Sequence, residues 1–382
     1  MIHSDAQVPQ GYRSLASPVY RGSTTLFPDA TSVDDSWDQY EVGYTYGLYG
    51  TPTTLELGGK ICELEKGYRT IITPGGQGAI ALINLAFLKS GDNVLIPESV
   101  YTPNRKLARH VLRRFGVDAT FYPPEIGAEI RELLRENTAL VWCESPGSIT
   151  MEIEDVPAIA RAAHERGVLV VLDNTWAAGI YFDAFAHGVD ITMQALTKYV
   201  GGHSDLLMGS VTVKDPKLYQ QLGATQQLLG SAASPDDCSL ALRGMKTMAV
   251  RLKHIEASAL RIARWLAGRR EIELVLHPAL EGAPGHELWK RDFTGSSGVF
   301  SIVFKAEATK PEVLAFVDAL ELFKIGYSWG GVTSLAVAYD FHGSKGRRPN
   351  YGHRIVRLNI GLEDTDDLIA DLESALNRVW RR

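Results

Sequence analysis

The stretch A-L-T-K-Y-V-G-G-H-S-D, residues 195–205, places a lysine between a buried apolar run and a pair of glycines. Upstream, V-L-D-N-T-W places Asp173 at the end of another apolar run, residues 167–172. A lysine amine can form a Schiff base with an aldehyde, and a carboxylate at the carboxyl end of a strand can keep a pyridine nitrogen protonated. Lys198 and Asp173 together therefore predict a pyridoxal 5'-phosphate cofactor. Taken alone, such residues more often cap a strand and a helix, so the prediction depends on the motifs around them.

The composition excludes several classes of protein. At 382 residues the chain exceeds the size of one hydrophobic core, so two domains are expected. Hydrophobic residues make up 45% and charged residues 22%, and no apolar stretch is long enough to cross a bilayer, so no membrane association is expected. The net charge of −6 without a long basic run argues against nucleic acid as a partner.

The cysteines and the start of the chain indicate a location. The first residues lack the charged and then apolar pattern of a secretion signal. Cys62, Cys143 and Cys238 are odd in number and widely spaced, which suits a reducing cytoplasm better than a disulfide framework. Neither they nor the ten histidines show the spacing of a metal site, so a cytoplasmic protein without a metal is expected.

Three segments are expected along the chain. Residues 1–50 are rich in Gly, Pro, Ser, Thr and Tyr and are predicted to form an N-terminal arm. In residues 51–244, the predicted cofactor-binding domain, short apolar runs alternate with helical patterns, which predicts an α/β fold with a mostly parallel sheet covered by helices. Residues 245–382 are expected to form a smaller α+β domain, entered through a helix over 249–266. The expected strands are 70–72, 93–96, 139–142, 168–172, 191–196, 208–213, 298–304 and 354–360, with further helices over 312–323 and 366–379.

The motif T-P-G-G-Q-G-A-I, residues 73–80, follows an expected strand and opens a helix. Small residues there expose backbone N–H groups at a helix N-terminus, where a phosphate is stabilised. Gly75, Gly76 and Gln77 are thus the candidate phosphate cradle. A glycine cluster is a weak signal that also suits a tight turn without a ligand, and it lacks both the lysine of triphosphate-binding loops and the spacing of a dinucleotide fingerprint.

Two further residues are candidates by position. Tyr101, in P-E-S-V-Y-T-P, follows the end of an expected strand and can stack on a cofactor ring or pass protons, although a lone tyrosine more often packs in a core. Arg357 lies in an expected strand, where a buried guanidinium needs an anion. It suits the α-carboxylate of an amino acid, and a structural ion pair is an equal alternative on this evidence.

Several strings are long and ordered: C-E-S-P-G-S-I-T-M-E-I-E-D-V-P-A-I-A (143–160), L-D-N-T-W-A-A-G (172–179), L-W-K-R-D-F-T-G-S-S-G (288–298), Y-S-W-G-G (327–331) and R-L-N-I-G-L-E-D-T-D-D-L-I-A-D-L (357–372). With the stretch around Lys198, they closely resemble the cystathionine β-lyases of the Cys/Met-metabolism family of pyridoxal-phosphate enzymes. The resemblance runs from about Tyr44 to the C-terminus.

This resemblance implies the aspartate-aminotransferase-like fold, PLP-dependent transferase fold type I, assembled as a homotetramer of two dimers with active sites shared between subunits. It implies that Lys198 forms the Schiff base, Asp173 pairs with the pyridinium and Tyr101 stacks on the ring. The remaining positions that it assigns are Gly76, Gln77 and Thr197 at the phosphate, Arg357 with the Ser328–Trp329 backbone at the substrate carboxylate, and Tyr46 at the phosphate of the neighbouring subunit.

Two positions depart from the family pattern. Members usually read Y-G-R-x-G-T-x-T, whereas residues 46–53 here read Y-G-L-Y-G-T-P-T. Leu48 therefore removes a charge-assisted contact worth about 1.5–3 kcal/mol, and Arg105 is a candidate substitute. After Y-S-W-G-G, Thr333 stands where a glutamate is usual. Both changes make the far end of the substrate site less charged.

The function that the resemblance implies is β-elimination of a carbon–sulfur bond, which would convert cystathionine to homocysteine, pyruvate and ammonia. Lys198 would move the Cα proton, and Lys198 or Tyr101 would protonate the leaving sulfur. Three alternatives stay open: a lyase for a less charged cysteine conjugate, a γ-type trans-sulfuration enzyme, and a cofactor-binding protein without catalysis. Only Leu48 favours the last of these, and the retained Lys198, Asp173, Tyr101 and Arg357 argue against it.

Overall fold

The larger sheet organises the first half of the chain. The computed structural model describes residues 11, 15–342 and 350–380, so most of the first part of the expected arm, residues 1–10 and 12–14, lies outside the description. Seven strands form this sheet in the order β1-β7-β6-β5-β4-β2-β3. They are β1 (Arg69–Thr73), β2 (Asn93–Pro97), β3 (Asp118–Tyr122), β4 (Thr138–Glu144), β5 (Leu169–Asp173), β6 (Ile191–Gln194) and β7 (Gly209–Val213).

Only β7 runs against its neighbours in this sheet. It pairs antiparallel with β1 and with β6, whereas the other neighbouring strands pair in parallel. The carboxyl ends of β1, β2, β4, β5 and β6 therefore meet along one edge, which is where open α/β sheets bind ligands. The mostly parallel sheet confirms the predicted fold class.

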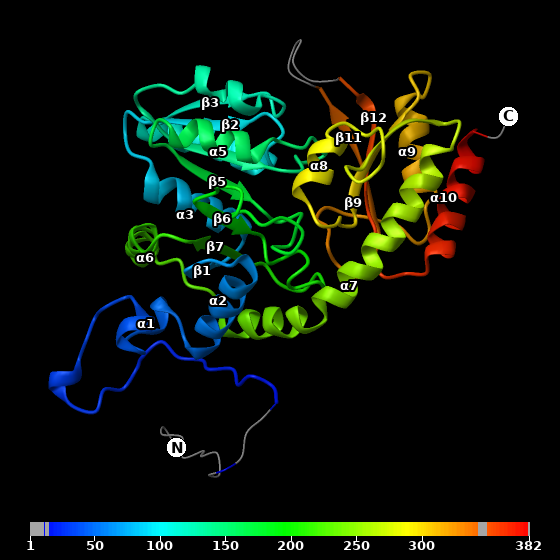
Figure 1. Cartoon of the computed structure of the whole chain (residues 1–382). Coiled ribbons are helices and arrows are strands. Elements are labelled where there is room, and N and C mark those ends of the chain that lie inside the picture. The colour runs from blue at the N-terminus through cyan, green and yellow to red at the C-terminus, as the bar shows by residue number, and fades with distance from the viewer. Residues whose placement is uncertain (1–10, 12–14, 343–349, 381–382) are drawn as a thin grey trace.

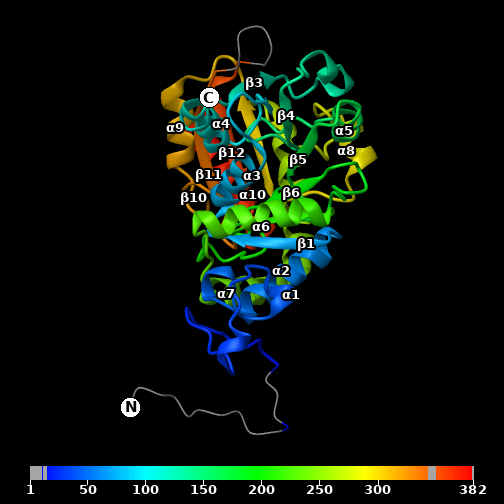
Figure 2. The ribbon, with the colours of Figure 1, turned by 90° about the vertical axis from the view of Figure 1, so that its left-hand side faces the viewer.

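Helices cover both faces of this sheet because its strands are apolar on both sides. Along β4, Leu140 and Trp142 face one buried cluster, and Val141 and Cys143 face the other. The first cluster includes residues of α3 (Gly76–Phe87), α4 (Thr102–His110) and α6 (Pro216–Leu229). The second includes residues of α2 (Pro52–Glu65) and α5 (Val156–His164). Helices α3 and α6 lie on the side of the sheet that faces the viewer in Figure 2.

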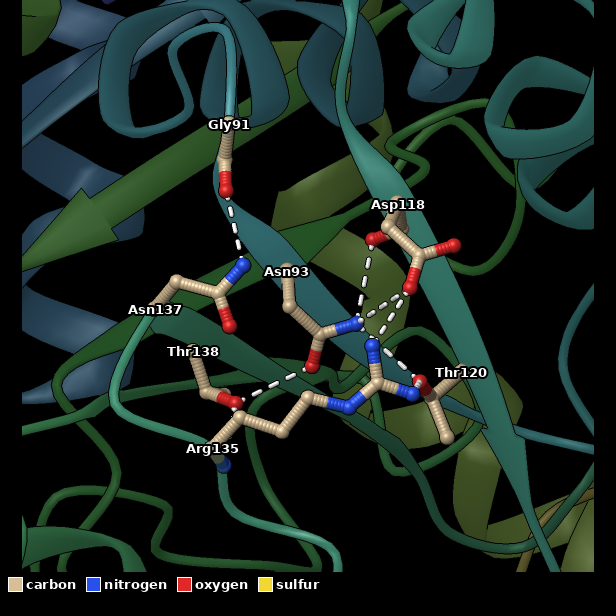
Figure 3. Close-up of polar contacts among 7 residues, drawn as sticks. All are labelled: Gly91, Asn93, Asp118, Thr120, Arg135, Asn137 and Thr138. Carbon is tan, nitrogen blue, oxygen red and sulfur yellow. Dashed lines mark hydrogen bonds and ion pairs between the residues drawn. The ribbon is translucent and has the colours of Figure 1, made fainter.

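The opposite edge of the sheet is closed by a polar network at the amino ends of β2, β3 and β4 (Figure 3). Asn93 is fully buried, and its amide nitrogen donates to the carbonyl of Asp118 at 3.3 Å and to Thr120 Oγ1 at 3.0 Å. Its amide oxygen accepts from Thr138 Oγ1 at 3.0 Å. Arg135 forms an ion pair with Asp118 at 2.6 Å. The Asn93 side chain thus satisfies polar groups on both neighbouring strands, β3 and β4.

A second, five-stranded sheet forms most of the last third of the chain. Its order is β10-β11-β12-β9-β8, and only the short β10 pairs in parallel with its neighbour. The strands are β8 (Ile272–Leu276), β9 (Val299–Phe304), β10 (Lys324–Ile325), β11 (Leu335–Phe341) and β12 (Gly352–Asn359). Helices α9 (Lys310–Asp318) and α10 (Thr365–Trp380) pack against it, and α8 (His286–Asp292) lies before β9. A capping box between Thr309 and Glu312 fixes the start of α9.

One long helix, α7 (Pro235–Ala267), runs from the first sheet to the second (Figure 1). It begins earlier than the expected start at residue 249, because Ser234 caps it, Pro235 occupies its first turn and two aspartates follow. The expected domain boundary at residue 245 therefore falls inside a continuous helix. The division into domains stays a prediction.

The remaining elements are short. The arm carries α1 (Gln39–Val42) and the 3₁₀ turns η1 (Ala30–Ser32) and η2 (Gly47–Tyr49), and further turns η3 (Leu112–Phe115) and η4 (Gly127–Glu132) connect strands of the first sheet. Figure 1 shows the arm extending away from the body of the chain. It is held near α6 by Trp37, whose ring lies 5.3 Å from that of Tyr219, and by a hydrogen bond from Tyr219 to Asp38.

Candidate active site

A cavity of about 730 Å³ opens where the carboxyl edge of the first sheet meets the second sheet. The loops after β1, β2, β4, β5 and β6 and residues of β11, β12 and the segment before β11 line it. Its lining includes nearly all the residues predicted from the sequence: Gly75, Gly76, Gln77, Tyr101, Asp173, Thr197, Lys198, Ser328, Trp329 and Arg357. The structure thus gathers in one place residues that are far apart in the sequence.

The glycine motif forms the start of α3 at the cavity wall. Gly75 has φ +115°, a conformation that side chains disfavour, and Gly76 packs so closely that a Cβ atom would lie 2.7 Å from the Cβ of Ala195. Among the described residues, Gln77 Oε1 is buried without a hydrogen-bond partner. The first N–H groups of a twelve-residue helix therefore face a space that an anion can fill.

Thr197 lies in the same wall, but its hydroxyl is already engaged. It donates to the carbonyl of Met208 at 3.1 Å and accepts from the Met208 N–H at 2.9 Å. Its single hydrogen is therefore directed at the backbone next to β7. A phosphate at this position would have to attract that hydrogen away from the carbonyl.

Asp173 ends β5 and is held by Thr175. The Thr175 hydroxyl donates to Asp173 Oδ1 at 2.5 Å, and the Thr175 N–H donates to the same oxygen at 3.0 Å. Burial raises the pKa of Asp173, while these hydrogen bonds and the charge of Lys198 oppose the rise. Thr175 also accepts from the N–H of Ala195 at 2.9 Å, which ties the ends of β5 and β6 together.

Lys198 follows β6 in a tight turn closed by the Gly202 N–H, which donates to the Lys198 carbonyl at 2.7 Å. Its amine donates to Ser328 Oγ at 2.6 Å and lies 5.3 Å from the ring centroid of Trp329. Burial, and secondly the positive charge of Arg357, lower the pKa of Lys198 to about 8. Near neutral pH the unprotonated amine, which can act as a nucleophile or base, is therefore far more populated than in an ordinary lysine with a pKa of 10.5.

Arg357 lies on β12 and is only 9% exposed. Its Nη2 donates to the carbonyl of Ser328 at 3.2 Å, and its guanidinium carbon lies 5.4 Å from the ring centroid of Tyr339. Within the described part of the chain it forms no ion pair with a carboxylate, and burial lowers its pKa. This buried cation is thus open to an anionic ligand.

Tyr101 caps α4, and its backbone N–H donates to a carboxyl oxygen of Glu144 at 2.6 Å. Its ring is 43% exposed and lines the cavity, where burial first and then the charge of Asp173 raise its pKa. Glu144 ends β4 beside Asp173 in the register of the sheet. Burial and the neighbouring Asp173 raise the pKa of Glu144 well above its usual range.

Two residues singled out by sequence, Tyr46 and Arg105, lie outside the cavity lining. Tyr46 does not line the cavity of its own chain; it is 45% exposed and its ring packs 5.9 Å from Tyr49. Arg105 does not line it either, because its side chain donates to the Glu98 carbonyl and lies 5.5 Å from the ring centroid of Phe121. The next residue, Lys106, is exposed and does line the cavity.

The sequence analysis did not single out several other residues of the cavity lining, among them Lys106, Glu144, Thr175 and Tyr339. The rule that located Asp173 at the end of a strand also applies to Glu144, in W-C-E-S-P, so its position was open to prediction. Tyr339 gave no such signal, because it reaches the cavity only through the pairing of β11 with β12.

The structure also bears on metals and membranes. In residues 15–342 and 350–380, His, Cys, Asp and Glu side chains nowhere form a group of three or more that could hold a metal ion. The helices of the described segments include none that is both long and apolar enough to cross a membrane.

Comparison with known proteins gives consistent results. The chain is 46% identical over 360 residues to the "Putative cystathionine beta-lyase" of Rhizobium johnstonii, which covers 93% of this chain and 89% of that protein. It is 42% identical to "Cystathionine beta-lyase MetC" of Escherichia coli, over 87% of this chain and 86% of that one. The crystal structure of metB from Corynebacterium glutamicum superposes with a TM-score of 0.88 at 29% identity, over 97% of this chain and 94% of that one. Because the family model for Cys/Met metabolism PLP-dependent enzymes also matches residues 1–377, the chain belongs to this family of PLP-dependent enzymes.

Proposed function

We propose that this enzyme cleaves the bond between Cβ and sulfur in an S-substituted L-cysteine, with cystathionine as the first substrate to test. One observation carries the proposal: the nearly buried Arg357, which has no carboxylate partner in the described residues, shares a cavity with the Lys198 amine. A buried guanidinium attracts a carboxylate, and the amine serves chemistry at the neighbouring Cα. The names of the relatives reported above support the reaction type.

The residues present fit pyridoxal phosphate. The start of α3 offers backbone N–H groups beside Gly76, where a Cβ atom would meet Ala195, so a phosphate can approach the helix N-terminus closely. At the other end of the cavity, Asp173 would pair with the pyridine nitrogen, and Lys198 would hold the aldehyde carbon. The Tyr101 ring would stack on the cofactor, and Thr197 would contribute its hydroxyl to the phosphate.

The cofactor supplies an electron sink that acidifies the Cα proton of the bound amino acid. The chain's own residues would do the rest. Arg357 and the Ser328–Trp329 backbone would orient the carboxylate, and the Lys198 amine, with its pKa lowered to about 8, would accept the Cα proton. Asp173, hydrogen-bonded twice by Thr175, would hold its negative charge opposite the ring nitrogen. Lys198 or Tyr101 would then protonate the sulfur as the bond between Cβ and sulfur breaks, releasing a thiol and 2-aminoacrylate. One water molecule would hydrolyse the 2-aminoacrylate to pyruvate and ammonia.

The second candidate function is cleavage of a less charged cysteine conjugate. Leu48 stands where the family usually has arginine, and Thr333 is exposed in place of a usual glutamate. Much of the cavity wall is apolar or aromatic, including Ile149, Leu207 and Tyr327. Lys106 argues against this second function, because it lines the cavity and its amine can pair with the distal carboxylate of a charged substrate such as cystathionine.

The test is steady-state pyruvate formation by the cofactor-loaded protein on cystathionine and on uncharged S-alkyl cysteines, with Leu48→Arg in parallel. If cystathionine is preferred and Leu48→Arg changes little, the first function holds. If uncharged conjugates are preferred and Leu48→Arg shifts the preference toward cystathionine, the second holds. Pyruvate from neither class would overturn the proposal.

We also propose that the active site is shared across a dimer within a homotetramer. Leu207 and Tyr327 line the cavity and are 74% and 82% exposed, so the cavity mouth is uncovered in one chain. Tyr46 lies on the outside of its own chain, as a residue donated to a neighbour would. In an equal mixture of Lys198→Ala and Tyr46→Phe subunits, about half of the dimers should be mixed, and each mixed dimer should have one site with neither change. Shared sites therefore predict that mixing restores up to about a quarter of the wild-type activity, whereas unshared sites would give no restoration. The cytoplasmic location stays a prediction, compatible with three free cysteines.

A further inference from the structure

Strand β11 places the aromatic ring of Tyr339 next to the guanidinium of Arg357. Strands β11 and β12 pair antiparallel, with Val337 opposite Arg357 and Tyr339 opposite Ile355. Side chains alternate along a strand and paired residues share a face, so Val337, Tyr339 and Arg357 lie on one face of the sheet. Tyr339 is half-buried and lines the cavity.

The Arg357 guanidinium has little else to hold it. Five N–H groups are available on an arginine, and the structure gives Arg357 one hydrogen bond, to the Ser328 carbonyl. No acidic side chain of the described residues forms an ion pair with it. The Tyr339 ring lies 5.4 Å from the guanidinium carbon, within the range at which the electron-rich face of an aromatic ring attracts a cation.

We propose that Tyr339 is a positioning residue that holds the Arg357 guanidinium by a cation–π contact and so keeps it ready for the substrate carboxylate. The inference rests on the proposed carboxylate-binding role of Arg357. A ring can support the cation without occupying its hydrogen-bonding edge, whereas an aspartate or glutamate in its place would compete with the substrate. The aromatic contact therefore fixes the cation and leaves its N–H groups for the ligand.

The chemistry of the contact makes a specific prediction about side chains. Within residues 15–342 and 350–380 the Tyr339 hydroxyl forms no hydrogen bond, whereas its ring contacts the Arg357 guanidinium, so the ring face is the part that acts. Tyr339→Phe should retain the effect, and Tyr339→Leu should lose it. Tyr68→Leu is the matched control, because Tyr68 lies outside the cavity lining and its ring makes the same kind of contact with another guanidinium, that of Arg69, at 4.9 Å.

The experiment measures binding of L-alanine to the cofactor-loaded enzyme by titration of the cofactor absorbance. Alanine has an amine and a carboxylate but no leaving group at Cβ, so binding is read without elimination. L-Alaninamide, which lacks the carboxylate, is titrated beside it, and Arg357→Leu is included. A cation–π contact of this kind predicts that Tyr339→Leu weakens alanine binding about 3- to 30-fold. Tyr339→Phe and Tyr68→Leu should stay within about twofold, and alaninamide binding should change little.

Three results would overturn the inference. Equal weakening of alanine and alaninamide would show a general structural role, and an unchanged alanine affinity in Tyr339→Leu would show no role. Loss of affinity in Tyr339→Phe as large as in Tyr339→Leu would exclude the ring face as the cause. If Arg357→Leu leaves alanine binding unchanged, then Arg357 does not bind the substrate carboxylate, and the proposed function loses its support as well. If Arg357→Leu weakens alanine binding and Tyr339→Leu does not, only the role of Tyr339 is refuted.

Discussion

Glu154 should carry a proton in the folded protein, because of the hydrogen bonds around Tyr122. The Tyr122 hydroxyl lies 2.5 Å from the carbonyl oxygen of Trp142 and 2.8 Å from Glu154 Oε2. A carbonyl only accepts, so the single Tyr122 hydrogen goes to Trp142, and Glu154 must donate the hydrogen of the second contact. The other carboxyl oxygen accepts from the Glu144 N–H at 2.9 Å. Burial raises the pKa of Glu154 to about 8, although hydrogen bonds to its carboxylate form, from the Glu144 N–H first, oppose the rise.

The raised pKa has a definite consequence for stability. In the unfolded chain the carboxyl of Glu154 loses its proton near its ordinary pKa of 4.5, whereas in the folded chain it retains it to about 8. Between these values the folded state binds more protons, so its stability falls as pH rises, by about 1.4 kcal/mol per pH unit for one group. The contribution is fully present below pH 4.5 and is lost by about pH 8.

Glu154→Gln removes this dependence while keeping the shape. The amide can donate to the Tyr122 oxygen and accept from the Glu144 N–H, as the protonated acid does. Between pH 5 and pH 7 the variant should therefore gain on the wild type by about 3 kcal/mol in the free energy of unfolding. Other buried acids, such as Glu65, are present in both proteins and largely cancel in the difference.

The assay is urea unfolding of both proteins, followed by fluorescence, at half-unit steps from pH 5 to pH 8. Glu129→Gln is the control, because Glu129 is exposed on η4 and should give a difference that is flat with pH. A difference between Glu154→Gln and wild type that is equally flat would refute the reasoning, since it would mean that Glu154 is ionised in the folded state. If the free energy of unfolding of Glu154→Gln relative to the wild type decreased as pH rises, the predicted direction of the pH dependence would be wrong.

Three further predictions concern the cavity. Thr175→Val removes the hydroxyl that donates to Asp173, a charge-assisted contact worth about 1.5–3 kcal/mol. The affinity for the cofactor, measured by absorbance titration, should therefore fall about 10- to 100-fold. An unchanged affinity would count against Asp173 as the pyridinium partner. Arg251 donates at 2.8 Å to the carbonyl of Tyr199, the residue after Lys198, and at 2.8 Å to the carbonyl of Gly244 in α7, and so ties the Lys198 turn to that helix. Arg251→Met leaves the Tyr199 carbonyl without this donor and should destabilise the loaded enzyme by about 1–3 kcal/mol in urea unfolding. A change below about 0.5 kcal/mol would contradict this role of Arg251. Lys106→Met should lower kcat/KM for cystathionine relative to S-methylcysteine about two- to fivefold, as expected for an exposed ion pair, while Lys60→Met on α2 should leave the ratio unchanged.

The first sheet was predictable because its strands are apolar runs bounded by turns. Every strand predicted from the sequence is present, and the two central chemical residues, Asp173 and Lys198, were located by following apolar runs to their ends. The strands missed in that sheet and the next, such as β3 (D-A-T-F-Y) and β11 (L-A-V-A-Y-D-F), are short or mix small and polar residues with apolar ones. Their pairing partners, which the sequence does not display, decide that they are strands.

The side of the cavity formed by the second sheet was less predictable for the same reason. Tyr339 reaches Arg357 through the register of β11 with β12, and a shift of one residue would turn it to the other face. The sequence analysis named Arg105 as the candidate cation, whereas its neighbour Lys106 lines the cavity. Which of two neighbouring helical residues reaches the cavity depends on which face of the helix is turned toward it. Near α4 that face is set by packing around Ala108, not by charge.

Residues 327–330 connect the two halves of the proposed site. The Lys198 amine donates to the Ser328 side chain, while Arg357 donates to the Ser328 carbonyl, so one residue contacts both the amine from the first sheet and the guanidinium from the second. Ser328 adopts φ +81°, and at Gly330 a Cβ atom would lie 3.1 Å from the Lys198 backbone. A non-glycine residue in this conformation costs free energy and persists only where its surroundings hold it. Because this segment fits closely against the turn of Lys198, a displacement of the second sheet would move the carboxylate site and the amine contact together. Recognition of an α-amino acid, which needs both groups at a fixed separation, is thus sensitive to how the two sheets are joined.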